Sequence, residues 1–172
     1  TITVSSLTIA AGNTFTITYG STASGGPGAT ATSSTGAQTW QAQEKSTSAG
    51  TLTDIASQPS ITVYAADGSG TMGASISGVS ASQTGRTITF TYTAASGGMQ
   101  NGSVTIAVPS GWTAPSTVSN NAGYTTATTG TVSVAGQTIT VGSLTLAGGA
   151  TTTITYGNTS GGGTGATASA TT

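Results

Sequence analysis

The chain offers very few side chains that could carry out acid–base, nucleophilic or metal chemistry. It has no histidine and no cysteine, which removes the Ser-His-Asp and Cys-His nucleophile arrangements and the usual zinc ligands. A glycosidase needs two carboxylates flanking one cleft. The only acids are Glu44, Asp54 and Asp67, and their positions suggest a repeat edge, a loop and a linker. We therefore expect no enzyme activity, no catalytic residues and no cofactor.

Two other charged positions suggest binding or cross-linking chemistry, each with a plainer alternative. Asp67-Gly-Ser-Gly could hold calcium between domains, but calcium prefers about six to eight oxygen ligands, usually from several carboxylates. A turn begun by Asp67 is the simpler interpretation, and we expect no metal site. Lys45 could form an intramolecular isopeptide bond helped by an acid, but the adjacent Glu44 would point to the opposite face of a strand. A solvated pair at the end of a strand is the simpler interpretation there.

Aromatic, hydroxyl and amide side chains suggest surface recognition or modification. Trp112 follows a Pro-Ser-Gly turn, where an exposed ring could stack on a sugar. Alternating threonines, as in residues 87–93, are similar to ice-binding faces; those faces use short repeats, so we favour solvated strand faces here. Asn101-Gly-Ser and Asn158-Thr-Ser match the N-glycosylation pattern, which makes Asn101 and Asn158 candidate glycosylation sites.

Residues 1–35 and residues 138–172 are two copies of one sequence. They align without a gap, with 23 of 35 positions identical, at an offset of 137 residues. A repeat of this length is a whole small domain, so it predicts a tandem array or an assembly of like units. We expect the chain to begin inside one copy of the repeat and to stop inside the next.

The composition favours a secreted protein that associates with copies of itself. Threonine (41), serine (24) and glycine (27) make up more than half of the chain, and only 3% of residues are charged. A net charge of −1 provides no basic patch for nucleic acid, and the apolar runs are too short to cross a membrane. A surface with so little charge is poorly protected against association. We therefore expect an extracellular or cell-surface location, with copies of the chain and surface glycans as the partners.

Apolar residues alternate with threonine and serine throughout, which predicts an all-β fold of antiparallel sheets packed as a sandwich. Strands are expected around residues 2–9, 15–19, 61–63, 88–92, 104–108, 132–134, 139–146 and 154–156, and around Trp40. The linker near residues 64–70 divides the chain. Residues 1–65 would be the C-terminal part of one repeat, with strands that complete a neighbour. Residues 66–172 would be most of a second repeat that lacks its last strands.

Two stretches carry a resemblance to a known family. They are Arg86-Thr-Ile-Thr-Phe-Thr-Tyr through Val108-Pro-Ser-Gly-Trp112, and Gly130-Thr-Val-Ser-Val through Val141 with the Thr-Ile-Thr-Tyr-Gly157 strand after it. The pattern resembles the tandem immunoglobulin-like repeats of very large bacterial and archaeal surface proteins. This resemblance implies immunoglobulin-like sandwich repeats in an extracellular stalk, adhesin or filament, and it supplies no functional residues.

The sequence therefore predicts a structural protein of an extracellular filament, stalk or surface layer. Neighbouring units would be joined by donor-strand complementation, in which an extended segment adds to an open sheet of its neighbour. Trp40, Ile61 and Val63 would be the assembly residues. The alternative is an adhesin or binding module that recognises a glycan or another surface. The identity of the two copies also predicts that their strands superpose.

Overall fold

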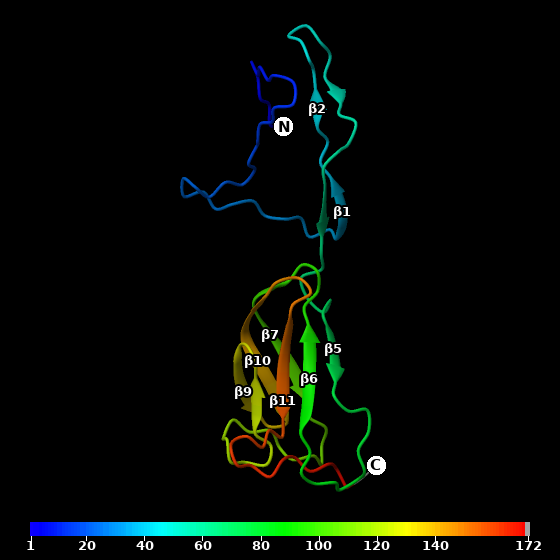
Figure 1. Cartoon of the computed structure of the whole chain (residues 1–172), viewed down its shortest axis with the longest axis vertical. Helices are drawn as coiled ribbons and strands as arrows, with labels where there is room; N and C mark the ends of the chain where they lie inside the picture. The colour runs from blue at the N-terminus through cyan, green and yellow to red at the C-terminus, as the bar shows by residue number, and fades with distance from the viewer. Residues whose placement is uncertain (171–172) are drawn as a thin grey trace. The chain divides into compact units, whose positions relative to one another are not determined.

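The computed structural model describes residues 1–170, which form two units, residues 1–34 and residues 35 onward (Figure 1). The described chain is all-β and contains no helix, as the alternating pattern predicts; consequently no described helix could span a membrane. The strands are β1 (Gly36–Thr39), β2 (Gln43–Glu44), β3 (Thr53–Asp54), β4 (Ser60–Val63), β5 (Thr71–Ala74), β6 (Ile88–Thr93), β7 (Met99–Ala107), β8 (Thr125–Ala127), β9 (Thr131–Ala135), β10 (Thr138–Leu146) and β11 (Thr151–Tyr156).

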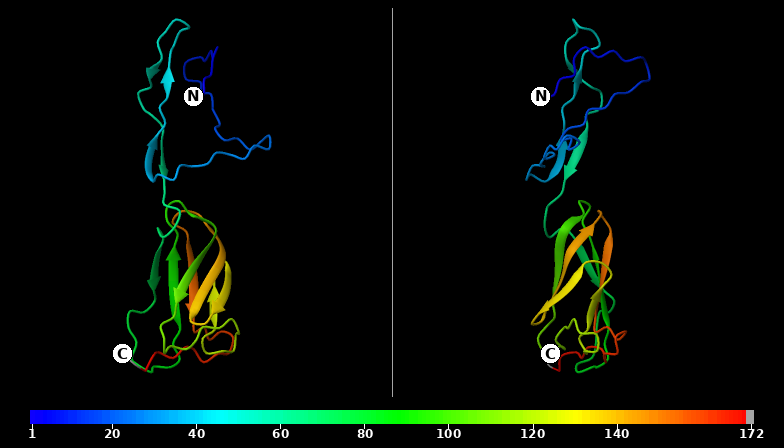
Figure 2. Two further views of the ribbon diagram at one scale, coloured as in Figure 1. Left: turned by 180° about the vertical axis from the view of Figure 1, so that it is seen from behind. Right: turned by 90° about the vertical axis from the view of Figure 1, so that its left-hand side faces the viewer.

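Residues 66–170, which we call the body, form two antiparallel sheets in a sandwich-like arrangement (Figure 2). One sheet has the strand order β5-β6-β11-β8 and the other has the order β7-β10-β9. The strands expected in this part of the sequence are confirmed. The sequence pattern does not predict strands β5 and β8, because both are short and neither has a clear apolar alternation.

The core of the body lies between the two sheets. Inward-facing side chains from β6 and β11 pack against those from β10, and Val108 and Ala166 close the cluster; its buried members are Ile88, Val108, Ile139, Val141, Leu144, Ile154, Tyr156 and Ala166. Each of these strands places alternate residues inward, which is the expected period for a sheet with one wet face. Thr152 is also buried, and its hydroxyl bonds to the hydroxyls of Thr129 (2.8 Å) and Thr128 (3.3 Å).

A bulge in β10 keeps its apolar residues inside. Val141 and Leu144 are both fully buried although they are an odd number of positions apart. Between them the pairing of β10 with β7 shifts register, and Ser143 has a positive φ of 55°. The extra residue of a bulge restores the inward direction for Leu144, which in a regular strand would face solvent.

Residues 36–63, which we call the hairpin, fold back on themselves. β1 pairs with β4 and β2 pairs with β3, both antiparallel. Between the two ladders the Gln58 side chain bonds both backbone groups of Ala42: the Ala42 N–H donates to its Oε1 (2.6 Å), and its Nε2 donates to the Ala42 carbonyl (3.1 Å). This bidentate contact joins the two short ladders.

Residues 1–34, which we call the N-terminal segment, contain no strand, so the strands expected at residues 2–9 and 15–19 are wrong for this chain. Strands need partners for their backbone groups, and an unpaired segment cannot bury its apolar face. The matching residues 138–156 pair with β6, β7, β8 and β9, whereas no such ladder forms in residues 1–34.

Candidate assembly site

An apolar groove opens along one side of the body, between the two sheets. It has a volume of about 370 Å³, and it lies between β5 and β6 of one sheet and the end of β7 in the other. Its walls are mainly apolar; they include Ile76, Val79, Phe90, Ile106, Pro109 and Trp112. None of the described residues that line it is charged, so its chemistry suits a second apolar surface rather than an ion or a polar substrate.

The groove lies beside an open sheet edge. β7 pairs with β10 on one side, and among residues 1–170 no strand pairs with its other side. β5 is likewise the last strand of the opposite sheet. An open edge presents unpaired backbone donors and acceptors that can accept another strand. Groove and edge together therefore offer both apolar contacts and a backbone ladder.

The chain passes close to the groove again near residue 169. The Ser82 N–H donates to the Ser169 carbonyl (3.0 Å), and the Thr113 N–H donates to the Thr167 carbonyl (3.1 Å). Val79, three residues before Ser82, and Trp112, next to Thr113, both line the groove. Residues 167–169 therefore run between two segments that border it.

The hairpin carries the three residues expected for assembly on one of its faces. In the β1–β4 ladder, Gln38 lies opposite Ile61 and Gly36 lies opposite Val63. The Trp40 N–H donates to the Pro59 carbonyl (2.8 Å), which continues this register. Because directly opposite residues share a face and alternate residues do too, Trp40, Ile61 and Val63 lie on the same face.

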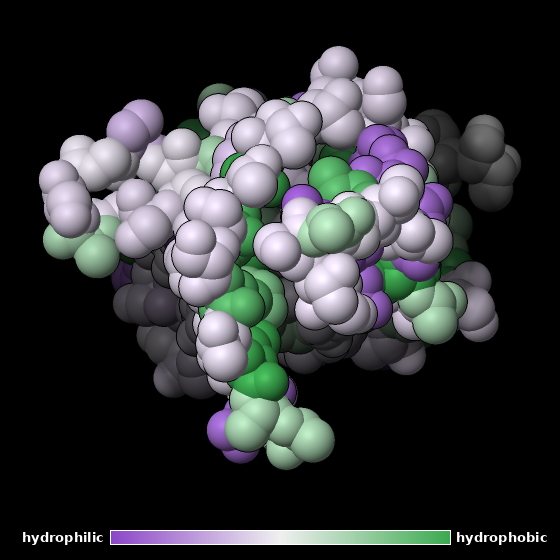
Figure 3. Space-filling model, turned by 90° about the horizontal axis from the view of Figure 1, so that it is seen from above, coloured by the Kyte–Doolittle hydropathy of each residue, from purple (hydrophilic) through white to green (hydrophobic). Residues whose placement is uncertain are grey.

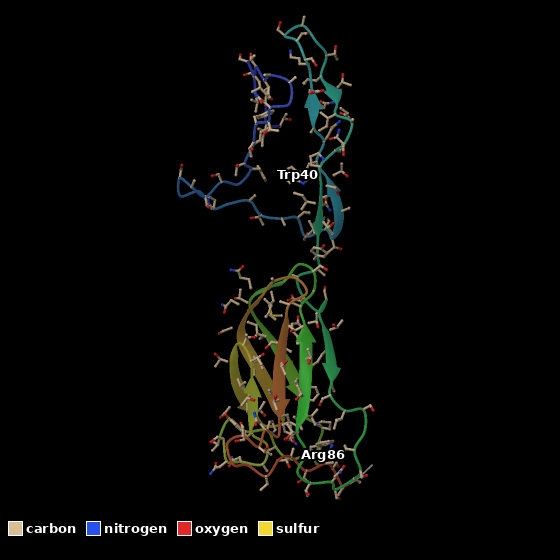
Figure 4. The ribbon with its side chains drawn as sticks, in the orientation of Figure 1. Trp40 and Arg86 are labelled. Atoms are coloured by element: carbon tan, nitrogen blue, oxygen red, sulfur yellow. The ribbon has the colours of Figure 1, made fainter. Side chains whose placement is uncertain are left out.

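This face carries three apolar side chains together with Gln38, and it is only partly covered. Trp40 is 44% exposed and Ile61 is 55% exposed, while Val63 is half-buried. Figure 4 labels Trp40, which lies between β1 and β2, and Figure 3 shows apolar side chains in green among the polar ones on the surface. The opposite face of the ladder holds Thr39, Ser60 and Thr62. The structure thus brings the predicted assembly residues together as one apolar stripe on a two-faced hairpin.

The acidic residues weighed as catalytic or metal-binding groups do not converge on one site. Glu44 and Asp54 lie in the β2–β3 pair at positions that face opposite ways, since Gln43 pairs with Asp54 and Glu44 with Thr53. Asp54 accepts hydrogen bonds from the side chains of Gln41 (3.0 Å) and Gln43 (2.9 Å). Within the described residues no three acidic, histidine or cysteine side chains gather.

Lys45 and Trp112 have ordinary local roles. The Lys45 ammonium donates to the nearby Ser48 carbonyl (2.9 Å) at the exposed tip of the hairpin, which agrees with a solvated lysine. Trp112 is half-buried and packs against the core cluster, where its ring forms part of the groove wall. Arg86, labelled in Figure 4, precedes β6, and its backbone exchanges hydrogen bonds with Ala166 (2.8 Å each way).

The two candidate glycosylation sites differ in access. Asn101 is exposed on β7, whereas Asn158 is half-buried at the end of β11. The Asn158 Nδ2, the atom that would carry a glycan, donates to the Thr126 hydroxyl (2.8 Å), and its Oδ1 accepts from the Ser160 N–H (2.8 Å). The geometry therefore favours Asn101 over Asn158 as an acceptor.

Tyr156 is the one titratable group, among the described residues, with a strongly altered environment. Its ring is buried in the core and its hydroxyl donates to the Thr113 carbonyl. Burial raises the pKa of Tyr156 from 10.0 to about 12, because the phenolate would lose its hydration. Tyr156 stabilises the core and also forms part of the groove wall, and its hydroxyl is bonded to the Thr113 carbonyl.

Comparisons of the chain with protein-family profiles, with curated proteins and with solved structures find no match. The functional argument therefore depends on the groove, the hairpin and the repeat alone.

Proposed function

We propose that the chain is a structural subunit of an extracellular filament, stalk or surface layer, without enzyme activity, built from immunoglobulin-like repeats joined by strand complementation. In this proposal the hairpin of one copy lies in the groove of another copy. The observation that supports the proposal is the presence of two partly exposed apolar surfaces: a groove beside the open edge of β7, and the hairpin stripe of Trp40, Ile61 and Val63.

The repeat supports this arrangement independently. At an offset of 137 residues, residue 172 corresponds to residue 35, so in a complete repeat the hairpin sequence would come directly after residues 138–172. Residues 167–169 are hydrogen-bonded to Ser82 and Thr113, which lie close in sequence to the groove residues Val79 and Trp112.

The expected strength of the joint can be worked out from the exposed areas. Complete burial of a large apolar side chain stabilises by about 1.5–3 kcal/mol. Trp40 and Ile61 are about half exposed, so these two together with Val63 would contribute about 2–5 kcal/mol on docking. The nine residues of β7 offer backbone hydrogen bonds in addition. Because neither surface is charged, salt should weaken the joint little.

The test compares assembly by two double variants of the hairpin. Trp40→Ala with Val63→Asp alters the apolar stripe, and Thr39→Ala with Thr62→Asp makes matched changes on the opposite face of the same ladder. We expect the second variant to assemble like the unmodified chain and the first to lose filaments or extended arrays in electron microscopy. Normal assembly by the first variant, or disassembly of the unmodified protein by moderate salt alone, would show that the stripe is not the joint.

A further inference from the structure

The turns of the N-terminal segment have the same backbone conformation as the matching turns in residues 138–170, although the segment forms no ladder. Each of its five residues with positive φ has a counterpart 137 residues later, within residues 138–170. The pairs are Ser6 (56°) and Ser143 (55°), Gly12 (81°) and Gly149 (76°), Gly20 (70°) and Gly157 (69°), Gly25 (81°) and Gly162 (91°), and Gly28 (82°) and Gly165 (79°). The β10 bulge at Ser143 is thus repeated at Ser6.

The turn hydrogen bonds of the two copies also match. The Asn13 N–H donates to the Ala10 carbonyl (3.1 Å), as the Ala150 N–H does to the Ala147 carbonyl (3.0 Å). The Gly25 N–H donates to the Thr22 carbonyl (3.0 Å), as the Gly162 N–H does to the Thr159 carbonyl (3.0 Å). The turns of the N-terminal segment are therefore those of the β10–β11 region, which we call the strand pair although β10 and β11 belong to different sheets.

Its apolar side chains are those that the body buries. Twelve residues within 138–170 are buried, and ten of the twelve are identical one repeat earlier; the two exceptions are Ile9 for Leu146 and Phe15 for Thr152. Ile17 is 51% exposed where Ile154 is 0% exposed, and Tyr19 is 60% exposed where Tyr156 is 2% exposed. In the body, strands β6 to β9 cover the matching face of residues 138–156, so strands of that arrangement would cover this face of the N-terminal segment.

Three differences nevertheless exclude the segment from this chain's own body. Ala11 stands where the body has Gly148, and a Cβ at that position would lie 2.0 Å from the Ser96 carbonyl oxygen. Ser24 stands in place of Gly161, where a Cβ would lie 2.5 Å from Ser119. Real Cβ atoms do not approach backbone this closely, so the surrounding loops would have to move.

The third difference lies in the core. Phe15 stands in place of Thr152, which is fully buried and bonded to the hydroxyls of Thr128 and Thr129. A phenyl ring there is much larger, and it would leave those two hydroxyls without this partner. Overpacking and lost hydrogen bonds both disfavour Phe15 at this position.

We infer that the N-terminal segment is the strand pair of a different repeat of the same fold. The partner presents strands arranged like β6 to β9. It differs from residues 71–135 by having room for a phenyl ring near the equivalents of Thr128 and Thr129, and by loops set back at the equivalents of Ser96 and Ser119. The three substitutions then act as a specificity device that prevents strand exchange between identical bodies. This inference goes beyond the proposed function, because it assigns the N-terminal segment to a non-identical repeat, whereas the hairpin joins copies of the chain; it does not depend on the hairpin joint.

The test uses the full chain and a disabled β11. Ile154→Asp places a charge in the core and prevents the body's own strand pair from docking. We expect this variant to lose the folded body, because the unmodified N-terminal segment fits poorly. Adding Ala11→Gly, Phe15→Thr and Ser24→Gly converts the segment to the sequence that the body accepts. We expect these changes to restore the near-ultraviolet circular dichroism of the packed core. The midpoint temperature of unfolding should then rise with protein concentration, because the segment comes from a second chain.

Two controls define the outcome. Adding Ile17→Asp to the restored variant should abolish the rescue, whereas adding Thr14→Asp, at the counterpart of the exposed Thr151, should not. Absence of rescue by the three changes would overturn the assignment of the segment as a strand pair. Equal rescue of Ile154→Asp by the unmodified segment would overturn the specificity, and rescue independent of concentration would overturn docking between chains. None of these variants alters Trp40, Ile61 or Val63, so filament assembly by the hairpin is scored separately.

Discussion

Replacing the same isoleucine in the two copies of the repeat should have very different effects on the stability of the body. Ile154 is fully buried in β11, with Phe90 and Ala127 opposite it on the two neighbouring strands. Ile17 occupies the same place in an almost identical local sequence, but half of its side chain is exposed. The pair isolates the contribution of tertiary packing because the local sequence is nearly constant.

Ile154→Ala should lower the free energy of unfolding of the body by about 3–4 kcal/mol, the range in which buried isoleucine truncations combine lost transfer energy with a cavity. For a body of roughly 100 residues this corresponds to a fall in Tm of about 12–30 °C. Ile17→Ala should change the free energy by no more than about 0.5 kcal/mol, as expected for an exposed position.

Thermal and urea unfolding of the two variants at low protein concentration, followed by Trp112 fluorescence and circular dichroism, would measure both values. Low concentration matters because association of the chains through the hairpin would add to the measured stability. Equal destabilisation by the two substitutions would refute the reasoning, since it would mean that residues 1–34 pack in the same way as residues 138–170 within one chain. A negligible effect of Ile154→Ala would also refute it, since the buried core would then not be the source of stability.

Three other outcomes depend on particular contacts. Tyr156 binds its proton more tightly in the folded body, so its contribution to the free energy of unfolding should be fully present below pH 10 and be lost as the pH rises towards about 12. Tyr156→Phe should remove this alkaline loss in urea titrations, and it should lower the free energy of unfolding by about 1 kcal/mol at pH 7 because the bond to Thr113 is lost. An alkaline loss of the same size in the variant would argue against Tyr156 as its source. Gln58→Ala should increase amide hydrogen exchange at Ala42 and leave exchange in β10 unchanged; protection that persists at Ala42 would show that the Gln58 side chain does not hold the hairpin together. Gly148→Ala should destabilise the body by about 1–3 kcal/mol, because the added Cβ would lie against the Ser96 carbonyl. Gly142→Ala should be close to neutral in the same unfolding assay, because a Cβ there has no atom within 4 Å. Similar effects of the two substitutions would contradict the steric argument.

Much of the fold could be predicted from the alternation of apolar residues. The strands of the body from β6 onward fall where that alternation is clear, apart from β8. The short strands β5 and β8 escape prediction because they have only four and three residues, with at most one large apolar side chain between them, and their pairing with β6 and β11 holds them in place. Residue type alone singles out Trp40, Ile61 and Val63 for assembly, but that they share one face follows only from the register of β1 with β4. The groove could not be located from sequence, because its walls come from segments between 74 and 156 that the fold brings together.

The two copies of the repeat distinguish features that depend on neighbouring residues from features that need partners remote in the chain. Local sequence set the turns: Ser6 and Ser143, and each pair of glycines one repeat apart, have nearly the same φ although their surroundings differ. Backbone sterics at glycine and hydrogen bonds over a few residues act within the turn itself, so they need no distant partner. The strands were decided by tertiary structure, because a ladder and a buried face require neighbours that are remote in the chain. Residues 138–156 have those neighbours in β6 to β9 and become β10 and β11, and residues 2–19, with nearly the same sequence, do not.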